Sequence, residues 1–548
     1  MSSREFSSRT REENLNKMCT GDFDIVIIGG GVTGAAIARD AAARGFNVAL
    51  LEKGDFASGT SSRSSKLIHG GLRYLKHARF SLVFGSLRER WTLRKNAPRY
   101  VKPLTFLIPV YENSTTGKLQ LSVGLWLYDI LALFRTEKIH EWLGPEQVKN
   151  REPKVTRDRL VGGGLYYDFV TDDALLVLAI VKDSWARGAV VANYTEVVGL
   201  QKDQGKIVSV EAVDLISGSR FSVKGKVVVN ATGPWSDQLR KLDDPSSEPK
   251  LRPAKGAHLL LPKTIIGNRE AVVLESPRDG RNLFVVPWGD LCLVGTTDTD
   301  YDGDLNQVLS TEEDVEYLLE SLRQYFPDEK VTREDIISSY AAVRPLAAEL
   351  GISEDNVSRD QLIFESRSGL VSIIGGKLTT HRSMAEALVN YVSRKLTREL
   401  ARTPTHGCET DRLPLDYDER EITSAVDNLV RDSGVERDVA THLVDAYGPD
   451  ATKVLEIASE DSGLASRIVA EAPYLLAEAR YAARCQMAVK LVDFMLRRTQ
   501  LALRFKDHGR SVARSIANEM AKELRWAPEM VEKEITDFEK ACALIEVR

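Results

Sequence analysis

Three glycines, Gly29, Gly31 and Gly34, stand between an apolar β-branched run at 25–28 and an alanine-rich stretch. This order predicts a buried strand, a tight turn and a helix. In the spacing G-x-G-x-x-G, the first glycine permits the turn, the second admits a pyrophosphate to the backbone, and the third lets the helix pack on the strand. Glu52 ends the next apolar run, near the ~20-residue offset expected for an acid that binds a ribose. The pattern predicts a dinucleotide whose phosphates lie at the helix N-terminus.

A second stretch, 59–74, carries groups that could contact a bound ligand. Small hydroxyl side chains are followed by a glycine pair, and Lys66, His69 and Arg73 stand close together. A flexible surface loop is the simplest interpretation of a serine-rich sequence. Three basic side chains beside a nucleotide-binding turn favour instead a loop that closes on a flat ligand.

The whole sequence has the composition of an ordinary globular protein with two or three domains. It holds 548 residues, of which 43% are hydrophobic and 28% charged. The net charge of −5 gives no support for nucleic acid as a partner. Five scattered cysteines without C-x-x-C spacing favour reduced thiols in a cytosolic setting over disulfides or a zinc site. Residues 1–20 are polar, lack the apolar core of a secretory signal and are expected to form a flexible tail.

Later strands indicate the fold class. The apolar run 226–230 ends in Ala231-Thr232-Gly233, and a strand, a glycine turn and a helix recur at 370–382. An apolar strand ending in Ala-Thr-Gly, far downstream of the first glycine turn, is typical of flavoproteins that bind FAD. Regularly spaced strands between these two segments predict a mostly antiparallel second sheet. We therefore expect an α/β (α+β) protein with a Rossmann-like FAD-binding domain, an antiparallel-sheet substrate domain and a C-terminal helical cap.

The expected boundaries follow from these elements. The two-sheet region spans 21–403, and a largely helical region spans 404–548. Within the first region we expect FAD-binding parts at about 21–80, 160–240 and 340–403, and substrate-domain parts at about 81–159 and 241–339.

The most apolar segment, 121–134, is predicted to be a helix rich in Leu, Trp and Phe. It is shorter than the ~20 residues of a membrane span, and Asp129 interrupts it. The segment fits a core helix or a lid, and it also fits an interfacial surface for a lipid or a lipid-soluble acceptor.

Several short motifs stand in a fixed order along the chain: Gly29–Gly34 with Glu52, Thr60–Ser62, Lys66–Tyr74, Ala231–Trp235, Lys255–His258, Gly295–Asp298, Val343–Leu346, Gly375–Thr380 and Asp493–Thr499. In this order they resemble the FAD-dependent, respiratory glycerol-3-phosphate dehydrogenases. The resemblance runs from about residue 22 to the C-terminus. Two positions depart from the family's pattern, because His381 stands where tyrosine is expected and Ala257 where serine is expected.

The resemblance implies oxidation of sn-glycerol 3-phosphate to dihydroxyacetone phosphate. FAD would accept the hydride, and a membrane quinone would accept the electrons from reduced FAD. The resemblance also implies a homodimer, cytoplasmic and bound peripherally to the inner face of the plasma membrane without spanning it.

The chemistry of that reaction selects substrate-binding candidates among the matched motifs. A phosphate dianion calls for arginines, whose planar forks bind oxygens in pairs. Arg73 and Arg344 are the first candidates, Arg359 is a third, and Tyr74 stands beside the first.

A base for the hydroxyl proton should titrate near neutral pH, which favours histidine. His258 is preferred to His69, which can instead position the flavin. Lys377 precedes a predicted helix and can stabilise an anionic flavin or the substrate. The expected catalytic set is therefore His258, Arg73, Arg344 and Lys377. The expected cofactor-binding set is Gly29, Gly31, Gly34, Glu52, Thr60, Ser61, Ser62, Lys66, His69, Gly71, Ala231, Gly233, Gly376, Lys377, Leu378 and Thr379.

Three alternatives remain open from the sequence. One is an oxidase of the same fold that reduces O2 to H2O2, and another is an FAD amine oxidase of the related glycine-oxidase type. Two arginines and a lysine suit a phosphate better than an amino-acid carboxylate. The third is a flavin-binding interaction protein, against which the joint presence of these basic residues speaks. No metal-ligand spacing is found, and the reaction requires none.

Overall fold

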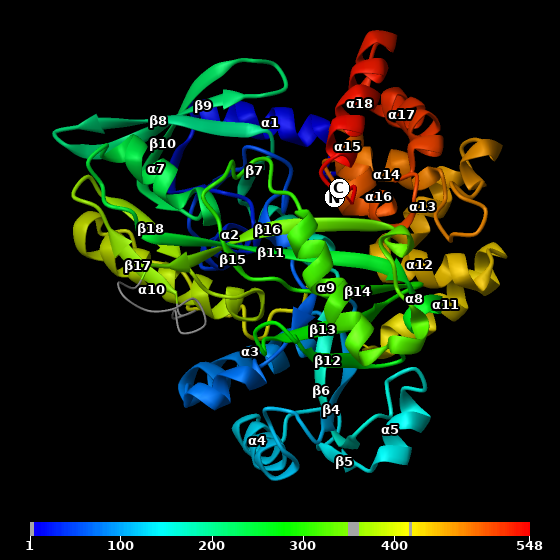
Figure 1. Ribbon diagram of the computed structural model, residues 1–548. Coiled ribbons are helices and arrows are strands. Elements are labelled where there is room, and N and C mark those ends of the chain that lie inside the picture. Colours follow the sequence, from blue (N-terminus) through cyan, green and yellow to red (C-terminus); the bar gives the residue numbers. More distant parts are fainter. Residues whose placement is uncertain (1–4, 349–360, 416–418, 548) are drawn as a thin grey trace.

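The computed structural model describes residues 5–348, 361–415 and 419–547. Two β-sheets form the body of the molecule, and the C-terminal helices, orange and red in Figure 1, pack beside them. The sheets hold the apolar β-branched runs of the sequence, which favour strands.

The first sheet has a parallel centre, as continuous apolar strands predict. Its order is β17-β18-β10-β1-β2-β7, with the hairpin β8–β9 joined to β10. The parallel strands are β1 (Asp22–Ile28), β2 (Val48–Leu51), β7 (Val190–Ala192), β10 (Arg220–Asn230) and β18 (Leu370–Ile374). The antiparallel ones are β8 (Thr195–Asp203), β9 (Lys206–Asp214) and β17 (Leu362–Glu365).

Both faces of this sheet are covered, because neighbouring residues of a strand point to opposite sides. In β1, Ile25 and Ile27 enter a core shared with α2 (Val32–Ala43), α6 (Asp173–Ala186) and α10 (His381–Leu400). Val26 and Ile28 enter a second core on the other face, shared with β8, β9, α1 (Ser8–Thr20) and α7 (Ser236–Asp243). Burying both faces leaves the carboxyl ends of the strands as the open edge for a ligand.

The second sheet is antiparallel except for the pair β4–β12, which confirms the predicted substrate-domain architecture. Its order is β15-β11-β14-β13-β12-β4-β6-β3, with β16 on β11 and β5 on β6. The strands are β3 (Leu67–Ile68), β4 (Val101–Tyr111), β5 (Glu141–Leu143), β6 (Leu160–Thr171), β11 (Leu251–Pro262), β12 (Ala271–Glu275), β13 (Asn282–Trp288), β14 (Leu291–Gly295), β15 (Thr299–Asp300) and β16 (Ser338–Ala347).

Two strands lie in a different sheet from the one expected. β6 falls in the segment 160–240 and β16 begins the segment 340–403, both of which were expected to belong to the FAD-binding part. β6 instead pairs with β4 along its whole length, and β16 pairs with β11. Such pairings are long-range, so the local pattern that predicts a strand does not predict its sheet.

The remaining helices flank the second sheet or form the C-terminal region, which is helical as predicted. Beside the sheet lie α3 (Phe80–Asn96), α4 (Lys118–Leu131), α5 (Pro145–Arg151), α8 (Lys263–Ile266) and α9 (Glu312–Tyr325). The C-terminal region holds α11 (Glu419–Ser433), α12 (Arg437–Tyr447), α13 (Ala451–Ala458), α14 (Ala477–Cys485), α15 (Leu491–Asp493), α16 (Leu501–Arg504), α17 (Arg510–Leu524) and α18 (Pro528–Cys542).

The expectation of a flexible tail at 1–20 is wrong for the described residues. α1 packs on the first sheet, where Met18 is fully buried. The buried Arg11 forms an ion pair with Asp214 and donates from Nε to the Asn193 carbonyl at 3.0 Å. These contacts join residues far apart in sequence, so a polar composition alone gave no sign of them.

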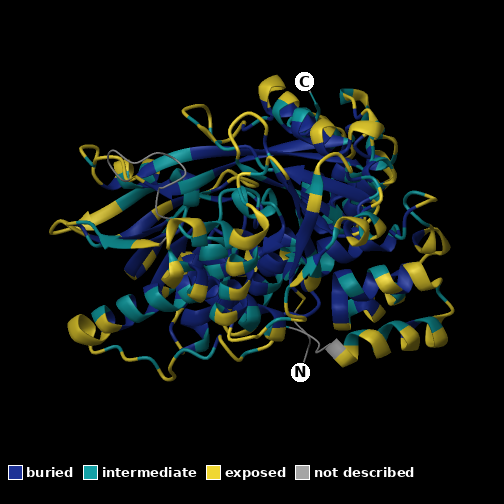
Figure 2. Ribbon diagram, turned by 60° about the horizontal axis from the view of Figure 1, so that its bottom comes forward, coloured by how far each residue is buried: buried dark blue, intermediate teal, exposed yellow. Residues whose placement is uncertain are grey.

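Strands and inward helix faces are buried, while exposed residues lie on the outer faces of helices and at loop tips (Figure 2). Among the helices that the structure describes, none is both long enough and apolar enough to cross a membrane.

Candidate active site

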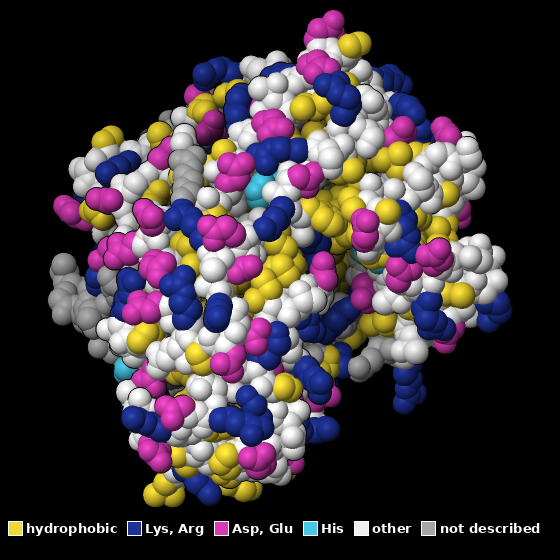
Figure 3. Space-filling view, turned by 45° about the vertical axis from the view of Figure 1, so that its right-hand side comes forward, with side chains coloured by type: hydrophobic (Ala, Val, Ile, Leu, Met, Phe, Trp, Pro, Cys, Tyr) yellow, Lys and Arg dark blue, Asp and Glu magenta, His cyan; other side chains and the backbone are white. Residues whose placement is uncertain are grey.

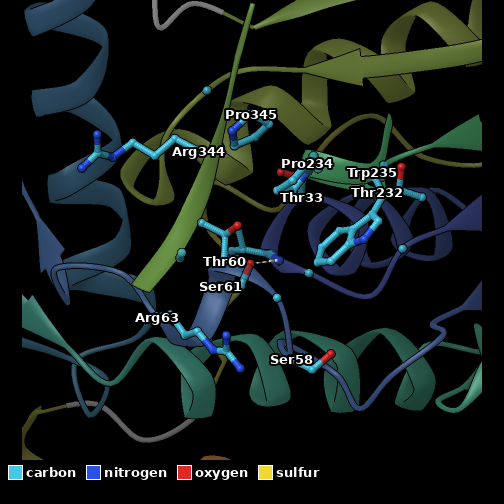
Figure 4. A pocket seen from close by; sticks show the side chains of 18 of the residues that line it. Thr33, Ser58, Thr60, Ser61, Arg63, Thr232, Pro234, Trp235, Arg344 and Pro345 are labelled. Atoms are coloured by element: carbon cyan, nitrogen blue, oxygen red, sulfur yellow. Dashed lines mark hydrogen bonds between the residues drawn. The ribbon is translucent and has the colours of Figure 1, made fainter. Parts of the chain in front are cut away.

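A cavity of about 520 Å³ opens at the carboxyl ends of the parallel strands. Its wall combines four segments that are distant in sequence: the glycine turn, the loop 58–65, the residues after β10, and the turn after β18. Figure 4 shows Arg344 and Trp235 at opposite sides of this pocket, with Thr60 and Ser61 between them. The predicted residues that line it are Gly29, Gly31, Glu52, Thr60, Ser61, His69, Ala231, Gly233, Gly376, Lys377, Leu378, Thr379, His258 and Arg344.

The glycine turn has the geometry that the spacing predicts. Gly29 has φ +110°, and a Cβ there would lie 2.6 Å from the Ala231 carbonyl oxygen. A Cβ on Gly34 would lie 1.8 Å from the Gly29 oxygen, so Gly34 lets the helix approach the strand without itself lining the cavity. α2 begins at Val32, which directs the N-terminus of the helix toward the cavity. The helix end is suited to bind phosphate.

Glu52 is buried at the end of β2 and is held by backbone groups. Its Oε2 accepts a hydrogen bond from the Gly30 N–H at 2.6 Å, and its Oε1 accepts one from the Gly54 N–H at 2.7 Å. Burial raises the pKa of the Glu52 carboxyl, and these two hydrogen bonds oppose the rise. The side chain is thus fixed beside the glycine turn, where an acid can bind ribose hydroxyls.

The loop 58–65 lies against the glycine turn. Ser61 Oγ accepts a hydrogen bond from the Val32 N–H at 3.0 Å, and Thr60 Oγ1 donates one to the Val343 carbonyl at 2.7 Å. The hydroxyl-rich sequence therefore ties the helix start to strand β16 and brings the two sheets together at the cavity.

A second cavity, of about 390 Å³, adjoins the first and lies over the second sheet. Ser65, Leu67, His69, Thr296 and Arg344 line both cavities. Arg73, Tyr74 and Gly71 line only the second. The ammonium of Lys377 lies 4.0 Å from the centroid of the Tyr74 ring, so the basic side chains gather at the junction.

Arg344 is held in place by strand ends of the second sheet. Its Nη1 forms an ion pair with Asp298, and its Nη2 donates to Thr296 Oγ1 at 3.1 Å and to the Thr297 carbonyl at 2.9 Å. The side chain retains 20% exposure. An arginine fixed in this way keeps a cationic fork at the junction of the cavities.

His258 lies on β11, and its Nε2 is 2.8 Å from Ser65 Oγ. Its ring stacks on Tyr340 at 5.0 Å between centroids. Burial, together with the charges of Arg344 and Lys66, lowers the pKa of His258 to about 3. The expectation that this histidine titrates near neutral pH is therefore wrong for the chain without substrate, and the imidazole is neutral at physiological pH.

Two other predicted site residues, among those that the structure describes, do not line the cavities as expected. The Lys66 ammonium is fully buried and lies 2.6 Å from Asp173 Oδ1, because the nearby acid at the start of α6 draws it away from the cavity wall. Ser62 also lies outside the lining of both cavities. Arg359 lies outside the described residues.

Other lining residues were missed from the sequence. Trp235 ends the motif Ala231–Trp235 and lines the cavity, and the Lys53 ammonium lies 4.2 Å from the centroid of its ring. Arg63 also lines the cavity, and its place among the basic residues of the loop 59–74 could have indicated a ligand-binding role. Burial and the charge of Arg497 lower its pKa to about 10. Val197 on β8 lines the cavity as well, and nothing in the sequence around it indicated a ligand site.

Comparisons with known proteins bear directly on this geometry. The family model described as FAD dependent oxidoreductase matches residues 24–382. The model described as C-terminal domain of alpha-glycerophosphate oxidase matches residues 408–531. A protein of Staphylococcus haemolyticus, named aerobic glycerol-3-phosphate dehydrogenase, is 38% identical over 90% of this chain and 89% of its own. A Staphylococcus aureus protein of the same name is 36% identical over 97% of both chains.

The chain belongs to the aerobic glycerol-3-phosphate dehydrogenase family of FAD-dependent oxidoreductases. A solved structure agrees: the glycerol-3-phosphate dehydrogenase from Bacillus halodurans, complexed with FAD, is 32% identical and superposes with a TM-score of 0.82. That match covers 99% of this chain and all of the other. The L-alpha-glycerophosphate oxidase from Mycoplasma pneumoniae, 19% identical with a TM-score of 0.54, shares the fold.

FAD is accordingly the cofactor, and the first cavity fits it. Gly31 lines the cavity at the start of α2, and because it has no Cβ the backbone there leaves room for a diphosphate. Glu52 can accept hydrogen bonds from ribose hydroxyls, and the turn 375–379 is part of the same cavity wall. Within the described part of the chain no group of three metal-ligating side chains occurs.

Proposed function

We propose that this protein oxidises sn-glycerol 3-phosphate to dihydroxyacetone phosphate. The observation that carries the proposal is the meeting of Arg344, Lys377 and the neutral His258 with the Arg73–Tyr74 turn where the two cavities join. Bound FAD supplies the hydride acceptor. The names of the relatives support the same substrate.

Arg344, Arg73 and Lys377 would hold the phosphate. A dianion at the junction would share the Arg344 fork, which Asp298 and the Thr297 carbonyl already orient. Lys377 lines the first cavity and lies against Tyr74, which lines the second, so its charge is available to the same anion. Fixing the phosphate orients the secondary alcohol for hydride removal.

His258 would accept the hydroxyl proton at Nε2. That atom lies beside Ser65 Oγ, and Ser65 lines both cavities. A phosphate dianion at the junction would offset the charges of Arg344 and Lys66, and so raise the pKa of His258 from its low value. Substrate binding would thus make the imidazole a stronger base when it is needed.

The test follows the reduction of a soluble quinone analogue by purified holoenzyme with either substrate, and with sn-glycerol 3-phosphate it also follows the formation of dihydroxyacetone phosphate. We expect product formation from sn-glycerol 3-phosphate and none from glycine. Release of H2O2 under air, at the rate of product formation without the quinone, would favour the oxidase alternative. Turnover of glycine without turnover of the phosphate ester would reject the assignment.

We further propose that the electrons of reduced FAD pass to a quinone, and that α3 and α4 form the surface of the protein that binds the membrane. The outward face of these helices and the turn after α4 carry large apolar side chains that are 42–80% exposed. Exposed Lys76, Lys118, Arg135 and Lys138 stand around it, which suits anionic lipid headgroups. Figure 3 shows hydrophobic side chains with Lys and Arg beside them at the lower end of the molecule, where these helices lie in Figure 1. The apolar set is Phe80, Phe84, Leu119, Val123, Trp126, Ile130, Leu133 and Phe134.

The second cavity supports a route from this surface to the flavin. Phe80 and Val123 of the apolar face line it, as do Leu121 and Leu127, and its other end joins the first cavity. A lipid-soluble acceptor could therefore enter from the membrane side. The inner membrane leaflet and the homodimer remain predictions, which membrane fractionation and sedimentation of the purified protein would test.

The membrane surface predicts that Trp126→Glu lowers binding to phosphatidylglycerol vesicles by roughly tenfold, because it places a charge among apolar side chains. Vesicle co-sedimentation at moderate salt measures this. Ile216→Glu is the matched control, since Ile216 is 49% exposed and Trp126 51%, but Ile216 lies by the β9–β10 turn. Unchanged vesicle binding by the Trp126 variant would remove α4 from the proposed surface.

A further inference from the structure

The motif Asp493–Thr499 forms a buried contact with the loop that follows Glu52. Asp55 Oδ2 accepts hydrogen bonds from Arg497 Nε and Arg498 Nη1, each at 2.6 Å, and its Oδ1 accepts one from Arg498 Nη2 at 3.0 Å. Asn193 Nδ2 donates to the same Oδ1 at 3.0 Å. The Asp55 side chain is wholly shielded from solvent. A bidentate, buried arginine–carboxylate pair is the strongest geometry available to these groups.

The segment 52–58 that carries Asp55 is part of the wall of the FAD cavity. Glu52 and Ser58 line that cavity, and the Ser58 N–H donates to the Asp55 carbonyl at 3.0 Å. The Ala57 N–H donates to the Gly30 carbonyl at 3.1 Å, inside the glycine turn. A Cβ on Gly30 would lie 2.9 Å from the Phe56 ring, so the loop packs tightly under the turn. A shift of Asp55 would therefore move the groups that surround the ribose and the diphosphate.

The C-terminal side of the contact is itself held firmly. Residues 494–498 form a π-helical turn, a local form that is frequent at functional sites. Consecutive helical residues do not normally face the same partner, yet Arg497 and Arg498 both reach Asp55. Asp493 pairs with Arg497 at 2.7 Å, and Arg498 Nη2 donates to the Gln486 carbonyl at 2.9 Å.

Charge makes this contact sensitive to change. Arg497 and Arg498 face the carboxylates of Asp55 and Asp493, and all four are buried. Breaking one member of a buried ionic group leaves an uncompensated charge, which is strongly destabilising. Arg63 lines the cavity, and burial together with the charge of Arg497 lowers its pKa, so the charge of Arg497 acts on a residue of the cavity wall.

We propose that segment 493–499 of the C-terminal helical region is a positioning element of the FAD site. By holding Asp55 it keeps the 52–58 loop closed on the glycine turn, so that Glu52 and Ser58 are in place before FAD binds. The C-terminal region therefore retains the cofactor, although none of its described residues lines the cavity.

The test uses the full-length holoenzyme, from which FAD is removed and then titrated back. Arg498→Lys keeps the charge and loses the bidentate geometry, and we expect FAD to bind at least tenfold more weakly. Arg514→Lys is the matched control, because Arg514 makes an exposed bidentate pair with Glu532 in the same region. FAD affinity is read from quenching of flavin fluorescence, and circular dichroism checks that each apoprotein is folded.

A second variant covers the case in which Arg498→Lys does not fold. The pair Asp55→Asn with Arg498→Gln removes both charges and leaves no unpaired ion, and we again expect weakened FAD binding. Unchanged FAD affinity in either folded variant would overturn the proposal. A lower unfolding temperature of the apoprotein with unchanged FAD affinity would also overturn it, because that result marks a role in packing alone. No substrate enters the measurement, so its outcome does not depend on the proposed activity.

Discussion

The cofactor end and the substrate end of the active site are formed by different kinds of groups. At the cofactor end, backbone geometry dominates: Gly29 and Gly34 allow close approach, and Glu52 is fixed by two backbone N–H groups. At the substrate end, charged side chains dominate, and Arg344 is fixed by an acid and by a carbonyl from the segment after β14. A backbone-built site depends on neighbouring residues, whereas a side-chain-built site depends on contacts between distant strands.

A clear loss at the cofactor end is expected from Gly29→Ala. The substitution would strain a backbone with φ +110° and place a methyl group 2.6 Å from the Ala231 carbonyl. A strain of about 3 kcal/mol corresponds to a loss of FAD affinity of about 100-fold. FAD content of the purified protein measures it. Gly85→Ala is the control, because a Cβ there meets nothing within 4 Å; equal FAD content in both variants would contradict the backbone account.

Arg344→Ala should spare the cofactor end and break the substrate end. Loss of a fixed phosphate partner should lower kcat/KM for sn-glycerol 3-phosphate by roughly 10³-fold, or about 4 kcal/mol, with FAD content unchanged. Arg278→Ala is the control, since Arg278 makes an exposed ion pair with Glu320 and lines neither cavity. A turnover as high as that of the control variant would show that Arg344 does not anchor the substrate.

The difference between the two ends also explains what the sequence could predict. Gly34 and Glu52 act through neighbours in one βαβ unit, and their predicted geometry agrees with the structure. Lys66 was expected to contact FAD, but its partner Asp173 stands 107 residues away, and no local pattern indicates that pairing. No local pattern indicates the ion pair of Arg11 with Asp214 either, and the segment expected to be a flexible tail is a packed helix.

The surroundings of a side chain, which set its pKa, were as hard to predict from the sequence as its contacts. His258, which was chosen from its motif, is one of the residues that line the cavity. Its low pKa comes from burial and from Arg344 and Lys66, which only the pairing of β11 with β16 and the fold of the basic loop bring near. The helical nature of 404–548 followed from periodicity, but its contact with Asp55 did not.

A smaller effect should appear in the pH dependence of stability. Folding lowers the pKa of His258 from 6.5 to about 3. As the pH falls below 6.5, the imidazole therefore takes up a proton in the unfolded chain but not in the folded one, and the free energy of unfolding decreases. Between pH 7 and 5, one such histidine accounts for about 2 kcal/mol. His258→Gln should therefore show a shallower loss of unfolding free energy in urea titrations. His381, with a pKa lowered to about 4, remains in both proteins as a shared background. Equal slopes for the two proteins would mean that the cationic substrate end does not suppress protonation of His258.

The most direct test of the central claim is anaerobic mixing of the yellow holoenzyme with substrate while the flavin absorbance is followed. The two cavities and their basic junction predict that sn-glycerol 3-phosphate bleaches the flavin and that glycerol, which lacks the phosphate, does not. A flavin that stays oxidised with sn-glycerol 3-phosphate, or that glycerol bleaches equally fast, would contradict the account.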